Sequence, residues 1–410
     1  MKKAVFLIII CLFILPCVYA FDGFYDYDFD EGKKPFRFNN RIVEIGFNAG
    51  INVSNDFLSI GQIFSETLVL NIDELQKGFR MNLGADLSPF YLNINTGTWG
   101  FGFFTNVDAV GAFGLSGNLL SFNNAIRDRS DVAGAVFASA GINTFFPIQK
   151  FRVKFNTAMF YPVIYIEPRN VSYTFTNTID GNFIMNIGYD LLVYSAFPIN
   201  EFPESFILSA RPGFDFTLGI EYPLSDAIRL NRALPSYLDF DIGLDFINIP
   251  IVPSTLTSYM RMFGLIGSLD PVDLEGFLET FNDFQNNTDY ENNGNKRVER
   301  PFKMIAWADW RPFLNRELFT VTPSLGFSIN EIYSNPVALE IGIAAKLSLA
   351  NIFNPSIGIS YEDRLWRNVF NLALNFRAIE LNFGAELQAQ SFLKSWNSGL
   401  GVNVGVKMGW

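Results

Sequence analysis

The chain contains no histidine, and its only two cysteines, Cys11 and Cys17, lie within the first twenty residues. Without histidine, a Ser-His-Asp triad, a Cys-His dyad and a histidine-ligated zinc site are excluded. Without cysteine after residue 20, no disulfide can stabilise the remaining chain, so its stability must come from burial and backbone pairing. We predict that the protein is not an enzyme and that it uses no cofactor and no metal.

Basic residues are also scarce, with 30 Lys and Arg against 41 Asp and Glu. An acidic chain without a basic cluster argues against nucleic acid as a partner. After residue 20, no apolar run is long enough for a helix to cross a bilayer. The chain is nevertheless 49% hydrophobic and contains 45 phenylalanines. A transmembrane barrel can place many aromatic residues on its lipid-facing side, whereas a soluble protein needs a large core to hide them.

The first twenty residues have the pattern of a cleaved signal peptide. Lys2 and Lys3 precede an unbroken apolar stretch from Ala4 to Leu15, and Val18 and Ala20 are small residues at the positions that a signal peptidase reads. We therefore expect a signal peptide at 1–20, an N-terminal extension or plug at 21–40, and one large domain at 41–410.

Most of that domain alternates apolar and polar residues with a period of two, which is the pattern of a β-strand with one apolar and one wet face. In the segment 337–349, every odd-numbered residue from Val337 to Leu349 is apolar, and the even-numbered ones include Glu340 and Lys346. Residues 238–246 and 379–389 alternate in the same way. Repeated long segments of this kind predict an all-β chain in which each strand crosses a membrane.

The predicted strands are 41–54, 79–94, 98–115, 132–146, 150–166, 169–178, 182–195, 205–222, 236–251, 301–312, 318–331, 336–349, 352–363, 366–377, 379–390 and 399–410. Short connections at 95–97, 147–149, 180–181, 350–351 and 378 follow even-numbered strands; the segment 223–235 is the exception. The long connections 55–78, 116–131 and 252–300 follow odd-numbered strands. Outer-membrane barrels have short periplasmic turns and longer outer loops, so we predict a transmembrane antiparallel up-and-down β-barrel of about 14–16 strands with partly helical loops at 57–78 and 255–284.

The polar face of these strands supplies the residues that we expect to line the lumen, namely Arg152, Lys154, Asp215, Glu221, Asp239, Asp241, Asp245, Lys303 and Lys346. Carboxylates in such a group can act as general acid and base. The simpler interpretation is a wet wall in which acidic and basic side chains pair, and a cation-selective or ligand-contacting patch is a third. Aromatic residues near strand ends, including Tyr165, Trp307, Trp310 and Trp366, fit either an interfacial girdle or a path for a hydrophobic ligand.

Residues 400–410 alternate apolar and polar to the last residue, Trp410. A terminal strand that ends on an aromatic residue resembles the signal read by the bacterial barrel-assembly machinery, so Trp410 is our candidate for that signal. The whole pattern from Arg41 to Trp410 resembles bacterial outer-membrane β-barrels, and within them the FadL-type transporters of hydrophobic compounds. The shared features are size, an N-terminal extension and partly helical outer loops. The Asn-Pro-Ala opening motif of that family is missing after Ala20, so no binding residue can be carried over.

This resemblance implies a barrel in the bacterial outer membrane, with membrane lipid and the assembly machinery as partners, that takes up small hydrophobic molecules passively. It further implies a blocked lumen, with Phe21–Asn39 or 57–78 inside, and a lateral opening of the wall. Pro89, Pro162 and Pro212 are candidate kinks because proline cannot donate to a strand ladder. The alternatives are a general cation-preferring porin and a surface adhesin or structural barrel that binds through the segment 252–300.

Overall fold

The structure is a computed structural model of the whole chain, and it describes residues 42–55, 59, 78–96, 99–116, 127–177, 183–197, 210–222, 224, 240–269, 288–291, 295–312, 318–333, 336–349, 352–376 and 378–410. The expected signal peptide and N-terminal extension lie outside the described residues, as does nearly all of the segment 57–78. Within the described residues, no helix is long and apolar enough to cross a membrane.

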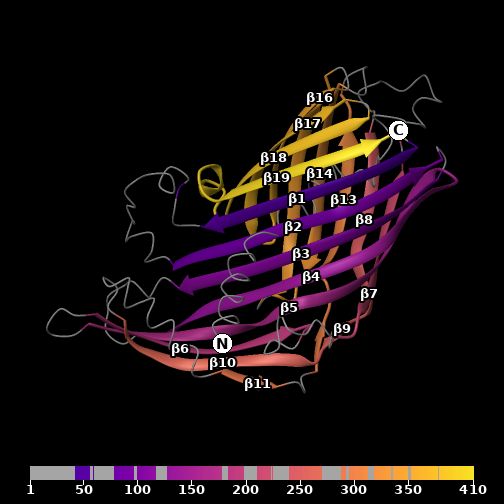
Figure 1. Cartoon of the computed structure of the whole chain (residues 1–410). Coiled ribbons are helices and arrows are strands. Elements are labelled where there is room, and N and C mark those ends of the chain that lie inside the picture. Colours follow the sequence, from indigo (N-terminus) through magenta and orange to yellow (C-terminus); the bar gives the residue numbers. More distant parts are fainter. Residues whose placement is uncertain are drawn as a thin grey trace.

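Fourteen antiparallel strands form a closed ring (Figure 1). In ring order they are β1 (Val43–Asn55), β2 (Gly78–Asn95), β3 (Gly100–Ser116), β4 (Arg127–Ile148), β5 (Phe151–Asn177), β7 (Gly213–Tyr222), β8 (Phe240–Val252), β13 (Phe302–Trp310), β14 (Phe319–Ile329), β15 (Val337–Leu347), β16 (Phe353–Glu362), β17 (Leu365–Asn375), β18 (Ile379–Ala389) and β19 (Leu400–Gly409). The predicted all-β up-and-down barrel is confirmed.

The ring closes where β19 pairs with β1 along ten residues of each strand. The carbonyl of Trp410 accepts hydrogen bonds from the backbone N–H groups of Ile42 and Val43 at 2.6 and 3.2 Å. We call the end of the barrel that holds Val43 and Gly409 the inner end, and the opposite end the outer end. The inner-end connections after β2, β4, β15 and β17 are short and the one between β7 and β8 is longer, as the sequence predicted.

Alternate residues of each strand face the two sides of the wall, and their exposure shows which side each faces. On β15, the outward residues Leu339 and Ile343 are 55% and 51% exposed, whereas the inward Glu340 and Ala344 are 3% and 5% exposed. The outward faces of the other ring strands are apolar in the same way, for example at Phe47, Phe103 and Phe383. This continuous apolar belt is the surface that a membrane-spanning barrel turns toward lipid.

Three further strands leave the ring. β6 (Phe183–Ser195), β10 (Ser258–Leu269) and β11 (Thr288–Glu291) form a sheet that extends from the outer part of β5, and β9 (Ser254–Leu256) pairs with β12 (Lys296–Val298). The predicted helical character of 255–284 is therefore wrong for residues 255–269, because backbone pairing with β6 and β12 satisfies their peptide groups. Residues 270–284 lie outside the described residues.

The sixteen predicted strands reduce to fourteen in the ring for two reasons. The segments 150–166 and 169–178 are one strand, β5, and the segment 182–195 is β6, which stands outside the ring. Because β5 crosses the wall without a break, the β5–β6 connection is at the outer end, where Asn177 pairs with Phe183. The prediction that the Asp180-Gly181 turn lies at the inner end was wrong.

Candidate functional site

The strand register places most of the predicted lumen-wall residues on the inward face. Arg152 and Lys154 on β5 lie opposite Glu221 and Gly219 on β7. The same inward row holds Asp215, Asp241, Asp245, Lys303 and Lys346. Asp239 lies outside the described residues.

At the inner end, these charged side chains form ion pairs across neighbouring strands. Arg152 Nη1 lies 2.9 Å from Glu221 Oε1, and Arg311 Nη2 lies 2.8 Å from Asp241 Oδ2. Lys407 and Glu380, which the sequence analysis did not single out, pair at 3.3 Å on β19 and β18. This pairing favours the wet-wall interpretation over a catalytic carboxylate pair at the inner end.

A second, buried charged row runs along the wall from β13 to β18. Lys303 Nζ reaches Asp363 Oδ2 at 3.7 Å, and Arg367 Nε lies 3.6 Å from Glu386 Oε1. Arg367 also approaches Glu362 and Asp363, at 3.8 and 3.9 Å. Only Lys303 of this row was among the sequence candidates, although the alternation of β16–β18 places the other charged side chains inward.

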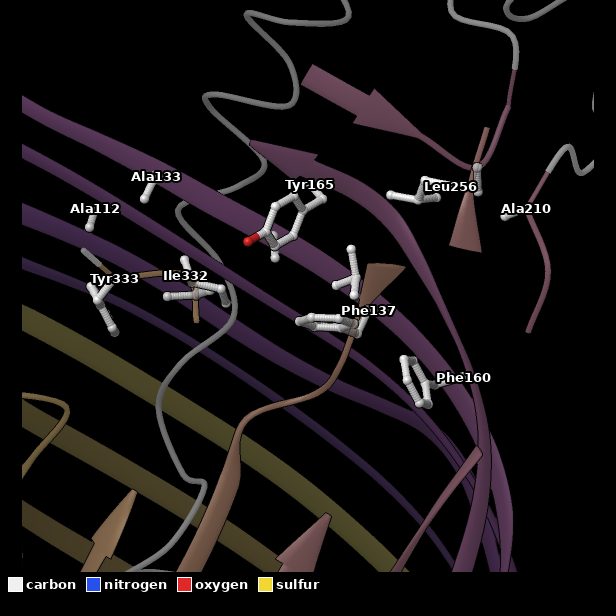
Figure 2. Packing of buried hydrophobic residues seen from close by; sticks show 13 residues of the cluster. Ala112, Ala133, Phe137, Phe160, Tyr165, Ala210, Leu256, Ile332 and Tyr333 are labelled. Carbon is white, nitrogen blue, oxygen red and sulfur yellow. The ribbon is translucent and has the colours of Figure 1, made fainter. Parts of the chain in front are cut away.

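Between residues 110–112 of β3, 133–137 of β4 and 160–165 of β5, the inward face is largely apolar, and it forms what we call the lumen compartment. Its residues are Val110, Ala112, Ala133, Ala135, Phe137, Phe160, Tyr165, Ala196, Ala210, Leu256, Val298, Ile332 and Tyr333. Figure 2 shows Phe137 and Phe160 side by side; their ring centroids lie 6.1 Å apart in an edge-to-face arrangement. Ala112 and Ala133, which are register partners on β3 and β4, lie near Ile332 and Tyr333 in Figure 2.

Two chain segments cover this compartment from the lumen side. The first is the small β9–β12 sheet, which contributes Leu256 and Val298. The second is the turn at 330–333 between β14 and β15, which contributes Ile332 and Tyr333 and lies over the inner faces of the opposite strands in Figure 2. We call these two segments the cover. Within the turn, Asn330 Oδ1 accepts the backbone N–H of Ile332 at 3.1 Å, so its conformation is fixed locally.

Arg300, just after β12, ties the cover to the wall. Its Nε and Nη2 donate to the two carboxylate oxygens of Asp215 at 2.7 and 2.6 Å, and Nη1 donates to Ser139 Oγ at 3.3 Å. The guanidinium carbon also lies 5.5 Å from the centre of the Phe160 ring. A bidentate, nearly buried Arg–carboxylate pair is among the stronger charged interactions in proteins. Asp215 therefore anchors the cover at the edge of the lumen compartment.

The rim of the cover is acidic. Lys296 pairs with Glu167 at 3.3 Å and lies over the Tyr165 ring. Partial burial and the nearby Glu331 carboxylate raise the pKa of Glu299 above its usual value. At this rim Lys296 is ion-paired with Glu167, and Glu299 and Glu331 add two further carboxyl groups.

The wall forks beside this compartment. Arg152–Phe160 of β5 pairs with β7, whereas the outer part of β5 pairs with β6. The partner changes around Pro162, where the register with β4 also shifts. Pro212 directly precedes β7, and Pro89 lies at a register shift between β2 and β3. All three proline positions predicted as kinks therefore coincide with irregular or terminal positions of strands.

Four inward aromatic rings lie over inward glycines on the neighbouring strand. The register pairs are Tyr91 with Gly46, Phe104 with Gly141, Phe160 with Gly213, and Trp307 with Gly243. In each case a Cβ added to the glycine would overlap the ring. Trp307 also donates from Nε1 to Asp245 Oδ2 at 2.8 Å. These aromatic residues fill lumen space by lying flat against the wall.

The architecture has counterparts among solved structures. The toluene transporter TbuX of Ralstonia pickettii aligns over 90% of this chain and 89% of its own, with 8% identity and a TM-score of 0.44. The P. putida toluene transporter TodX gives 12% identity, 90% and 89% coverage, and a TM-score of 0.45. The monoaromatic hydrocarbon channel CymD aligns over 95% of this chain and 93% of its own, with 8% identity and a TM-score of 0.47. No protein-family model and no curated protein matches the chain. The barrel assignment rests on the closed ring of this chain itself.

The lumen compartment was not predicted as a site, although the sequence contains a signal for it. Residues 132–138 of β4 are apolar or glycine at every position, so this stretch lacks the alternation seen elsewhere. A strand that is apolar on both faces has no face suited to water, so we expect its inward face to be covered. Among the described residues, no group of three or more Asp, Glu, His or Cys side chains could hold a metal ion.

Proposed function

We propose that this protein is an outer-membrane channel for the passive uptake of small hydrophobic molecules, and that the lumen compartment is its binding site. The observation that carries the proposal is a covered apolar surface on the inner wall of a barrel whose inner end and β13–β18 wall carry rows of charged side chains. A ligand with one aromatic ring or a short alkyl chain would displace the side chains of Ile332 and Tyr333 and pack against the alanines of β3 and β4.

The fork beside Pro162 gives the proposed route from the compartment to the membrane. Phe160, Ala196 and Ala210 belong both to the compartment and to the segments that flank the change of partner along β5. An apolar molecule that leaves sideways at this point stays among apolar side chains until it meets lipid, and does not cross the charged inner end. The sequence predicted Phe21–Asn39 or 57–78 as the block, and nearly all of these residues lie outside the described ones. The cover, which comes from other segments, supports a blocked lumen by itself.

The proposed blockage by the cover also argues against the general porin, which requires an open aqueous lumen. The adhesin alternative relied on 252–300 as a binding loop. Much of that segment is instead committed to strands, and its residues Leu256, Val298 and Arg300 pack into the lumen. The export signal at 1–20 and the assembly signal at Trp410 remain predictions that belong to this proposal.

The proposal is tested by binding of a neutral apolar fluorescent probe, 1-N-phenylnaphthylamine, to the refolded protein in detergent. Ala135→Leu adds bulk inside the compartment, whereas Ala140→Leu adds the same bulk on the outward face of the same strand. We expect Ala135→Leu to abolish saturable probe binding and Ala140→Leu to retain it, with both barrels folded by their heat-dependent gel mobility. Equal binding by the two folded variants would show that the compartment is not the site.

A further inference from the structure

The connection between β18 and β19 folds back against the outside of the barrel. We call residues 391–398 of this connection the arm; it includes the short helical turn Lys394–Trp396, visible beside the outer ends of β18 and β19 in Figure 1. Asn368 on β17 pairs with the outward residues Ile359 and Leu387, so its own side chain faces outward. It is nevertheless fully buried, because the arm covers it.

Hydrogen bonds fix the arm in this position. Asn368 Nδ2 donates to the carbonyl and the hydroxyl oxygen of Ser395, at 2.9 and 2.7 Å. Ser395 Oγ in turn donates to the Phe392 carbonyl at 2.7 Å. A polar amide on a lipid-facing strand would cost free energy if it were left without partners in an apolar environment. The arm supplies two acceptors for the Asn368 Nδ2 group and so ties the outer end of β17 to Ser395.

The surface of the arm is apolar and exposed. Leu393 is 80% exposed, and Phe392 and Trp396 are 42% and 41% exposed. Their rings continue an aromatic row from the wall: Tyr361 to Trp366, Trp366 to Phe392 and Phe392 to Trp396 lie 5.2, 5.0 and 6.4 Å apart between centroids. Lys394 lies between these residues in sequence. Aromatic and aliphatic side chains with one basic residue are the composition of a segment at a membrane interface.

The occupant of this surface follows from its continuity with the belt. On the same strands, the outward residues Ile357, Phe370 and Phe383 are exposed to a similar degree and belong to the lipid-facing surface of the ring. The arm extends that surface outward at the outer end. A basic side chain beside it suits the phosphate groups of lipid headgroups, to which a lysine can extend from an apolar position.

We propose that the arm inserts Phe392, Leu393 and Trp396 into the outer-leaflet lipid and so fixes the depth of the outer rim in the membrane. This inference rests on the proposed membrane placement of the barrel, but not on the identity of its cargo. The partner is bilayer lipid with phosphate headgroups, and the competing occupant of an exposed apolar surface, a second copy of this chain, is one outcome of the test.

The test uses single-tryptophan proteins in vesicles of phosphatidylcholine and phosphatidylglycerol that carry bromine on the acyl chains near the headgroup. The chain has six tryptophans, and in each protein the other five are changed to Phe. Trp396 reports on the arm. Trp310, exposed on the outward face of β13, is the positive control, and Trp307, buried in the lumen, is the negative control. We expect Trp396 to be quenched to a similar extent as Trp310, and Trp307 to be protected.

Three outcomes distinguish a failure of the proposed arm insertion from a failure of the proposed membrane placement of the barrel. If Trp310 is quenched but Trp396 is reached only by aqueous acrylamide, the arm is in water and the inference is wrong. If Trp310 is not quenched either, the barrel is not in the bilayer and the proposed placement fails first. If Trp396 is shielded from both quenchers in samples that cross-link as dimers, the occupant is a second copy and the inference is also overturned.

A second measurement avoids the loss of tryptophans that pack in the native barrel. No cysteine follows residue 20, so Leu393→Cys gives one labelling site for an environment-sensitive dye in an otherwise unchanged protein. We expect the dye emission to shift to shorter wavelength when the protein is transferred from an amphipathic polymer, in detergent-free buffer, to vesicles. An adjacent Phe392→Asp substitution should reverse that shift. An emission unchanged by vesicles would overturn the inference even if the tryptophan variants failed to fold.

Discussion

Single glycines determine where the large rings of the lumen lie. Gly243 faces inward on β8 directly opposite Trp307, and the indole covers the space that a side chain would need. We predict that Gly243→Val lowers the free energy of unfolding by about 1–3 kcal/mol, the usual cost of forcing extra atoms into a packed site. Urea unfolding followed by tryptophan fluorescence measures this change.

The matched control for that substitution is Gly111→Val, because Gly111 faces outward and its nearest neighbour would be an ordinary contact, Leu83 Cβ at 3.8 Å. If both variants unfold at the same urea concentration as the unchanged protein, the close fit of ring and glycine contributes nothing measurable to stability.

The Arg300–Asp215 pair leads to a second prediction at this scale. Because both side chains are largely buried, Asp215→Ala should cost about 3–5 kcal/mol by leaving a buried cation without its partner. Arg152 and Glu221 form the comparison pair, since the Arg152 side chain is 27% exposed; Glu221→Ala should cost about 0.2–1 kcal/mol. A double-mutant cycle for each pair, by urea unfolding, isolates the coupling. Equal coupling energies would contradict a special role for Arg300.

Among the structural elements, the cover should control access to the lumen compartment. Ile332 is fully buried in the compartment, so Ile332→Ala should weaken the closed cover by about 2–5 kcal/mol. That change raises the open fraction at least about tenfold. The rate at which a small thiol reagent modifies an introduced Ala135→Cys reports this opening, since Ala135 is fully buried when the cover is closed. An unchanged rate would mean that other segments, and not this turn, limit access.

Individual elements were predicted with uneven success, for physical reasons that can be named. β15 and β18 were predicted closely because their alternation is uninterrupted, and a one-residue slip would turn every apolar side chain inward. The predicted strands 150–166 and 169–178 left out residues 167 and 168, which include Pro168, whereas in the structure β5 continues through them with a change of partner and shifts of register. Alternation identifies the two faces of a strand but not the strand that pairs with each part of it, so β6 was wrongly placed in the ring.

The site was less predictable than the fold. Inward charges such as Asp241 and Lys303 follow from alternation alone, and the structure places them in the lumen. Arg300 and Ile332 lie in connections between ring strands, where no periodic pattern indicates their direction. Their partners Asp215 and Phe160 come from distant parts of the chain, and only the closed ring brings them together.

At the scale of the whole molecule, the covered lumen predicts an electrically silent channel. We expect the refolded protein, residues 21–410, to show no steady conductance in a planar lipid bilayer. The combined Arg300→Ala and Ile332→Ala variant should conduct and should prefer cations, because acidic residues outnumber basic ones in the chain by 41 to 30. Steady conductance of porin size by the unchanged protein would contradict the proposed function and favour the general porin.

The pairing of β1 with β19 joins the two most distant strands of the described chain. While the barrel is being assembled, β1 therefore lacks its final neighbour until β19 is in place. Throughout that period the nascent sheet has two unpaired edges, which are open to adhesion between molecules. Contacts between such distant residues also make folding slow. The step most exposed to aggregation is thus the last one, and protection of the edges of β1 and β19 should raise the yield of folded protein more than any change within the wall.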